Sequence, residues 1–162
     1  TISNKTYNGK AQKPSVTVKA GSEKLVKDKD YTVSYKNNVK PGKATVTITG
    51  KHTYKGSKKV TFKIVPKKQA MSKVKSSKKA QLKATWKKDS TVTGYQVVIA
   101  KNKKFTSGKK TATITKNKTV SKTFTKLSKG KKYYVKVRAY KTIDGKKYYG
   151  SYSSYKTVKV RK

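Results

Sequence analysis

The sequence has no cysteine among its 162 residues. A disulfide framework, a thiol nucleophile and a cysteine-ligated metal site are therefore excluded. Histidine occurs once, as His52, and there are 5 acidic residues. Chemistry with paired carboxylates needs two acids held at a defined separation, whereas these acids are scattered among expected turns. The sequence therefore predicts no enzymatic activity, no metal site and no cofactor.

Negative charge is scarce, whereas 45 lysines and arginines give a formal net charge of +40. Arginine occurs only at Arg138 and Arg161. Arginine is preferred for bidentate recognition of bases, whereas lysine is a mobile, strongly hydrated point charge. The composition therefore predicts general attraction to polyanions rather than sequence-specific binding of nucleic acid. A purely solubilising coat is the alternative, although a small soluble domain usually needs a net charge of only about 2–8.

Long apolar runs are also missing, so no segment is predicted to insert into a membrane. The chain begins at Thr1 without a signal peptide, and we expect it to be part of a longer protein. Hydrophobic residues make up 32% and aromatic residues 10% of the sequence. That content exceeds what a disordered polycation carries, so the chain is expected to fold around two small cores.

The first part of the chain alternates apolar residues with Thr, Ser and Lys, which is typical of strands with one buried face. The predicted inward-facing sets are Val16, Val18 and Ala20; Tyr31, Val33 and Tyr35; Ala44, Val46 and Ile48; and Val60, Phe62 and Ile64. The segment 66–80 is rich in lysine and serine and breaks the alternation. We therefore place a polar joint near residues 66–70, with domains at 1–66 and 67–162.

Strand periodicity restarts after this joint, and no helix is predicted. The inward-facing sets there are Leu82, Ala84 and Trp86; Tyr95, Val97 and Ile99; Tyr133, Val135, Val137 and Ala139; and Val158 with Val160. Gly and Asp-Gly turn signals are consistent with about seven short strands. Residues 133–160 are interpreted as two strands around one turn. The predicted core residues are Trp86, Tyr95, Leu127, Tyr133, Val135 and Val137.

Residues 70–162 resemble a fibronectin type III domain. The likeness is carried by Trp86 in "LKATWKK", by "GYQVVIAKNKKF" at 94–105 and by "LSKGKKYYVKV" at 127–137. The resemblance implies a β-sandwich in which Tyr133 is the tyrosine-corner residue, whose hydroxyl bonds the backbone a few residues upstream.

Residues 4–66 resemble the small β-sandwich repeats of secreted and wall-attached proteins of Firmicutes, through "YNGKAQKPSVTV", "DYTVSYKNN" and "GKATVTITGKHTYKG". This resemblance implies an extracellular location and a role in spacing or adhesion. The predicted fold class is therefore all-β, with two tandem antiparallel β-sandwich (Ig-like and fibronectin III-like) modules in a monomer.

A tyrosine cluster near the last predicted turn is the candidate ligand contact. Tyrosines on both faces of one strand cannot all point inward, so some of them are expected to be exposed. Exposed tyrosines among lysines suit stacking on sugar rings or bases, and the edge-strand propensity of tyrosine is the alternative explanation. The candidate contact residues are Tyr148, Tyr149, Tyr152, Lys146 and Lys147.

These observations predict a non-catalytic spacer and attachment region that binds anionic cell-wall polymer, such as teichoic acid. An adhesin for host glycans or proteins is the first alternative, and a non-specific nucleic-acid binder is the second. A Lys–Asn isopeptide bond, with Asn37, Asn38 or Asn117 as the partner, is a further hypothesis that needs a buried acid beside the pair.

Overall fold

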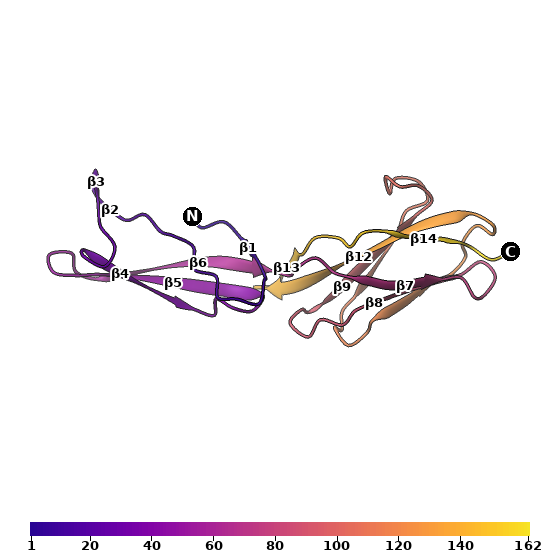
Figure 1. Ribbon diagram of the computed structural model, residues 1–162, viewed down its shortest axis with the longest axis horizontal. Coiled ribbons are helices and arrows are strands. Elements are labelled where there is room, and N and C mark those ends of the chain that lie inside the picture. Colours follow the sequence, from indigo (N-terminus) through magenta and orange to yellow (C-terminus); the bar gives the residue numbers. More distant parts are fainter. The chain divides into compact units, whose positions relative to one another are not determined.

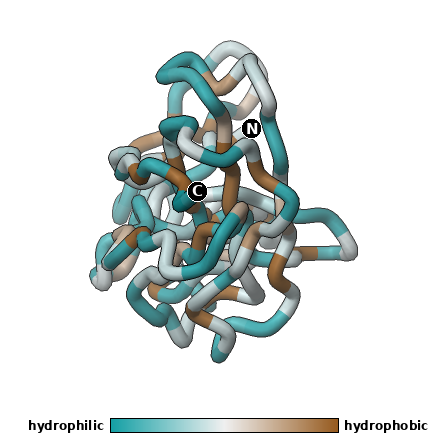
Figure 2. Tube along the Cα trace, turned by 90° about the vertical axis from the view of Figure 1, so that its right-hand side faces the viewer, coloured by the Kyte–Doolittle hydropathy of each residue, from teal (hydrophilic) through white to brown (hydrophobic).

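The computed structural model describes all residues 1–162 and consists of strands, turns and loops, which confirms the all-β prediction (Figure 1). The chain divides into two compact units, Thr1–Val65 and Pro66–Lys162. We call them the first unit and the second unit. The predicted alternation is visible along the chain trace, where hydrophobic residues in brown interrupt hydrophilic residues in teal (Figure 2). No helix in the chain has the length and apolar character needed to span a membrane.

The first unit is built on one four-stranded sheet with the strand order β1-β6-β5-β4. Its central strands are antiparallel, whereas β1 runs parallel to β6. A separate two-stranded hairpin joins β2 to β3. The strands are β1 (Lys5–Thr6), β2 (Lys19–Ala20), β3 (Glu23–Lys24), β4 (Tyr31–Lys36), β5 (Gly42–Gly50) and β6 (Ser57–Val65). The core of this unit consists of Ala44, Val46, Phe62 and Ile64, packed against partly buried neighbours.

The predicted strand at residues 15–20 is wrong, because only Lys19–Ala20 is a strand and Ala20 is exposed. The preceding residues form an extended segment that packs on the core through Val16. The Tyr35 hydroxyl donates a hydrogen bond to the carbonyl of Pro14 at 2.7 Å, and the Tyr31 hydroxyl donates to the carbonyl of Val16 at 3.3 Å. Tyrosine side chains therefore hold this segment in place of a strand ladder.

The second unit contains two sheets. One has the strand order β10-β9-β12-β13, with β14 also paired to β12, and the other has the order β11-β8-β7. The strands are β7 (Met71–Lys75), β8 (Leu82–Trp86), β9 (Gly94–Ala100), β10 (Lys110–Ile114), β11 (Ser121–Phe124), β12 (Lys132–Ile143), β13 (Lys146–Tyr149) and β14 (Lys156–Lys159). Inward-facing residues of both sheets share one core, so the unit is a two-layer sandwich.

The core of the second unit contains the six residues that the sequence singled out. Their exposed fractions lie between 0% and 5%. The rings of Trp86 and Tyr95 lie 5.4 Å apart between the sheets, at a tilt of 60°. The Tyr133 hydroxyl accepts a hydrogen bond from the backbone N–H of Ser128 at 3.2 Å, which is the geometry of a tyrosine corner.

Two sequence interpretations need correction in the second unit. Strand β7 lies inside the segment 66–80, whose sequence breaks the strand alternation. A register shift between Met71 and Lys73 accounts for this, because a bulge changes which side chains share a face. Residues 133–160 form three strands rather than two, because the long strand β12 pairs with β14 near its start and with β13 near its end.

Candidate polyanion-binding surface

Lysines face each other across neighbouring strands in both units. Four register positions pair lysine with lysine: Lys19 with Lys24, Lys43 with Lys63, Lys75 with Lys83, and Lys132 with Lys159. None of the strand registers pairs a lysine with an acidic residue. Like charges directly opposite one another destabilise a sheet. The arrangement therefore concentrates positive charge in a way that stability alone does not favour.

Asp28, Asp30 and Asp89 make local contacts, whereas Glu23 accepts a hydrogen bond from the distant Tyr54 hydroxyl. Lys27 forms an exposed ion pair with Asp28 at 2.9 Å. Asp30 accepts a hydrogen bond from the backbone N–H of Val26, and Asp89 accepts one from the backbone N–H of Thr91. With 5 acids against 45 cations, these carboxylates leave most of the positive charge without a carboxylate partner.

A stack of aromatic rings and cations covers the outer face of the β9–β12 pair. The Lys136 ammonium group lies 3.9 Å from the ring centroid of Phe105 and 4.4 Å from that of Tyr152. The Arg138 guanidinium carbon lies 4.5 Å from the same Tyr152 centroid and 3.8 Å from the centroid of Tyr149. The order along the stack is therefore Phe105, Lys136, Tyr152, Arg138 and Tyr149, with cations and rings in alternation. Cation–π contacts of this kind are strongest when they are partly shielded from water.

Gln96 on β9 fastens the stack to the sheet. Its side-chain oxygen accepts a hydrogen bond from Nε of Arg138 and another from the hydroxyl of Tyr152, both at 2.9 Å. Burial, assisted by the charges of Lys109 and Arg138, lowers the pKa of Lys136. Burial also raises the pKa of Tyr152, although the nearby Arg138 charge partly offsets this. The stack is thus a partly desolvated unit in which an arginine plane serves better than a lysine.

The candidate contact residues from the sequence take different positions around this stack. Lys146 and Lys147 are exposed on β13. Tyr149 and Tyr152 are half-buried within the stack, where the cations of β12 lie over their rings. Tyr148 is half-buried too, with the Lys146 ammonium group 6.0 Å from its ring centroid. The ring faces expected to meet a sugar or base are therefore partly covered by the protein's own cations.

Four residues of the stack were not predicted from the sequence, namely Phe105, Lys136, Arg138 and Gln96. The one usable signal in the sequence was Arg138, an isolated arginine in a lysine-rich chain. A guanidinium plane stacks on aromatic rings in a way that an ammonium group does not, so an outward-facing arginine on a strand indicates a stacking contact.

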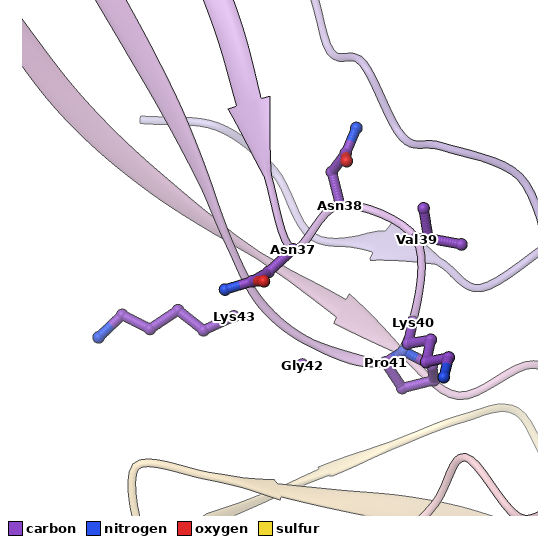
Figure 3. A pocket seen from close by; sticks show the side chains of 7 residues that line it. All are labelled: Asn37, Asn38, Val39, Lys40, Pro41, Gly42 and Lys43. Atoms are coloured by element: carbon purple, nitrogen blue, oxygen red, sulfur yellow. The ribbon is translucent and has the colours of Figure 1, made fainter.

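A hollow of about 440 Å³ lies at the loop between β4 and β5 in the first unit. Its lining residues are Asn37, Asn38, Val39, Lys40, Pro41, Gly42 and Lys43 (Figure 3). Their side chains point in different directions rather than toward a common centre (Figure 3). The Asn38 amide donates a hydrogen bond to the carbonyl of Gln12 at 2.9 Å. The hollow therefore gathers no set of groups for chemistry.

The geometry also bears on the isopeptide hypothesis. No lysine side chain is buried, and the amide of Asn117 donates hydrogen bonds to the carbonyls of Ser90 and Val92. No acidic residue is buried as a whole either, so the buried acid that the hypothesis needs is not found in the structure.

Residues 66–152 match the family model of the fibronectin type III domain. The chain belongs to this family. The fibronectin type III domain extends past the matched residues in the structure, because β14 pairs with β12 and Val160 is buried in the shared core. Domains of this family are scaffold or binding modules, typically of extracellular or surface proteins, and are generally not enzymes.

The fold is shared with solved structures, one of which is the crystal structure of chicken CNTN1 FN1-FN3 domains. The match has a TM-score of 0.51 at 19% sequence identity and covers 74% of this chain and 43% of that chain. At this identity the likeness describes the fold alone. No curated protein sequence matches the chain.

Proposed function

We propose that this chain is a non-catalytic spacer and attachment region of a larger secreted or wall-associated bacterial protein, and that it binds anionic cell-wall polymer such as teichoic acid. The first unit then belongs with the small surface repeats of Firmicutes that its sequence resembles. The location, the polymer and the source all form part of this proposal.

The observation that carries the proposal is the set of lysine pairs across the strands. In the second unit, Lys75 lies opposite Lys83 and Lys132 lies opposite Lys159, and all four side chains are exposed. A solubilising surface intersperses both charge signs and avoids large fields of one sign. A polyanion relieves the repulsion between such lysines, because its negative charges sit between them and its counterions are released on binding.

The use of lysine instead of arginine favours a binding mode with many weak contacts that exchange readily. An ammonium group on a flexible stem follows a mobile phosphate without a fixed geometry, whereas a guanidinium favours bidentate pairing. One arginine of this chain, Arg138, is committed to the aromatic stack. This distribution favours attachment to an irregular polymer over recognition of one defined ligand.

Binding of the 162-residue chain to purified Gram-positive cell walls tests the proposal. We expect binding at low salt, loss of binding after removal of teichoic acid, and a steep salt dependence. For roughly 6–10 phosphate contacts, affinity falls by about 10³–10⁵ between about 50 and 200 mM salt. Absence of binding at physiological salt would remove the attachment role and leave a spacer.

The adhesin alternative predicts a different result in the same assay. Binding would then persist in about 0.5 M salt, where charge interactions are screened within a few Å, and would be lost when Tyr149 or Tyr152 is changed to Ala. We rank this alternative second, because Arg138 already lies over both rings. Non-specific binding of nucleic acid ranks third and is tested by including DNA as a competitor.

A further inference from the structure

Three exposed lysines share the outer face of the three-stranded sheet β11-β8-β7. Lys73 and Lys75 lie on β7, and Lys83 lies on β8 directly opposite Lys75. Their strand neighbours Val74, Leu82 and Ala84 point the other way, into the shared core. We call this group the lysine face.

A bulge in β7 creates the lysine face. Met71 is buried opposite Trp86, yet Lys73 pairs with Thr85, so the register shifts between them. Without this extra residue, strict alternation would place Lys73 on the same side as Met71. Bulges commonly re-aim side chains beside functional sites. Here the bulge puts both lysines of β7 on the side that carries Lys83.

Hydroxyl groups fill the remaining positions of this face. One row across the sheet reads Thr123, Lys83 and Lys75, and the next row reads Ser121, Thr85 and Lys73. Strands lie about 4.8 Å apart, and residues two positions apart on one strand lie about 6.6 Å apart. Ammonium and hydroxyl donors are therefore arranged in a grid with spacings of a few ångströms, without an acidic residue in either row.

The lysines of this face are crowded. The nearby amino group of Lys75 lowers the pKa of Lys73. Crowded ammonium groups are stabilised when an anion lies between them. Phosphate oxygens accept hydrogen bonds from ammonium and hydroxyl groups alike.

We propose that the lysine face is a specific docking site for a linear phosphodiester polymer, with successive phosphates held by Lys73, Lys75 and Lys83 and by the hydroxyl groups between them. This inference rests on the proposed function and deepens it, since it assigns the attachment to one face instead of to the whole lysine coat. Charge complementarity selects a polyanion, and the rows of hydroxyl donors select phosphate groups on a flexible chain.

The test compares four forms of the 162-residue chain for binding to synthetic poly(glycerol phosphate) of defined length. The first is the natural sequence. The second carries K73Q, K75Q and K83Q. The third carries K103Q, K104Q and K118Q, which removes the same charge from exposed loops of the same unit. Affinity is measured at several salt concentrations.

We expect the lysine-face variant to bind at least about tenfold more weakly at low salt. Its slope of log affinity against log salt should fall by about 2, because each phosphate contact on a single-stranded polymer contributes about 0.7. The loop variant should lose less than half of that slope. The fourth form, which carries K73R, K75R and K83R, keeps the charges and should keep most of the binding. A higher melting temperature of the lysine-face variant would show that it is folded.

The two levels of the proposal fail in different ways. Equal losses in the lysine-face and loop variants would overturn the specific site and leave general attachment intact. Equal affinity of the natural chain for a heparin fragment of matched charge would also overturn the phosphodiester assignment. A natural chain that does not bind the polymer at all would overturn the proposed function itself.

Discussion

The two units start from the same sequence pattern and reach different cores. Both alternate apolar residues with lysine, threonine and serine. The second unit faces two sheets against each other, and 16 buried residues form its core cluster, whereas the corresponding cluster of the first unit has 4. Small domains bury a smaller fraction of their surface and are correspondingly marginal. The difference in core size reflects what covers the inner face of each sheet: a second sheet in the second unit, and no second sheet of that size in the first.

In the first unit, that cover includes an extended segment instead of a second ladder. Its apolar residue Val16 packs on the sheet, and tyrosine hydroxyls bond the carbonyls of Pro14 and Val16. Such bonds each contribute about 0.5–1.5 kcal/mol net. The segment lacks the mutual support of paired strands, so the first unit is expected to be the less stable of the two.

The largest expected effect comes from truncating one large core residue in each unit of the intact chain. Phe62→Ala and Trp86→Ala should each cost roughly 3–5 kcal/mol. That loss should unfold the marginal first unit, while the second unit remains folded but less stable. Amide NMR spectra check this, since dispersed signals of residues 1–65 should disappear only in the Phe62 variant. If the first unit stays folded and the second unfolds, our ranking of the two cores is wrong.

A second prediction concerns where the fibronectin type III domain begins. The sequence suggested a polar joint at residues 66–70, but Gln69 is buried and its amide donates a hydrogen bond to the carbonyl of Lys87, while the carbonyl of Ala70 accepts one from the Lys87 N–H. Fragment 66–162 should therefore fold alone. Fragment 71–162 should be less stable by about 1–3 kcal/mol, because it loses the buried Gln69 side chain and leaves the backbone N–H and carbonyl of Lys87 without these partners.

Urea unfolding of the two fragments provides the measurement. A fragment 68–162 serves as the control, since it removes only the start of the segment and keeps Gln69. Identical midpoints for the fragments starting at 66 and 71 would show that residues 66–70 are a linker after all.

The sequence predicted the buried faces better than the pairing of strands. Val16 faces the core of the first unit as the alternation indicated, yet no strand partner exists for it, because periodicity reports burial and not hydrogen bonding. Strand β7 was missed for the opposite reason. Its bulge breaks the period of two, although Met71 and Val74 still pack on the core.

The candidate surface was predictable only in its charge. The excess of lysine follows from composition, whereas which lysines meet across strands depends on register, which a single sequence does not reveal. Tyr149 and Tyr152 were identified as contact residues without their cation partners, because the stack joins β12 to a segment more than ten positions away. Such long-range pairs have no local signature.

A third prediction tests whether the stack needs an arginine plane. Arg138→Lys keeps the charge but loses the flat contact with the rings of Tyr149 and Tyr152 and the Nε bond to Gln96. We expect a loss of about 1 kcal/mol in the second unit, measured by thermal unfolding. Arg161→Lys is the matched control, because Arg161 is exposed and its guanidinium donates a hydrogen bond to the backbone carbonyl of Ser77 rather than to an aromatic stack. Equal effects of the two changes would argue against the stack.

The smallest expected effect comes from relieving one lysine of the lysine face. Lys75 lies opposite Lys83, and its amino group lowers the pKa of Lys73. Lys75→Gln removes both effects. The second unit should become slightly more stable, and the gain should shrink in salt. Lys103→Gln, in an exposed loop, should change nothing measurable.

The direction of the Lys73 pKa shift determines how this last effect depends on pH. Because the pKa of Lys73 is lower in the folded chain than its ordinary value of 10.5, the folded state loses that proton first as the pH rises. The repulsive cost is thus fully present at neutral pH and disappears as the pH rises through the folded pKa toward 10.5. The advantage of Lys75→Gln should therefore be largest near pH 7 and fade in alkaline buffer. A gain that is constant from pH 7 to alkaline pH would mean that packing, and not charge repulsion, separates the two proteins.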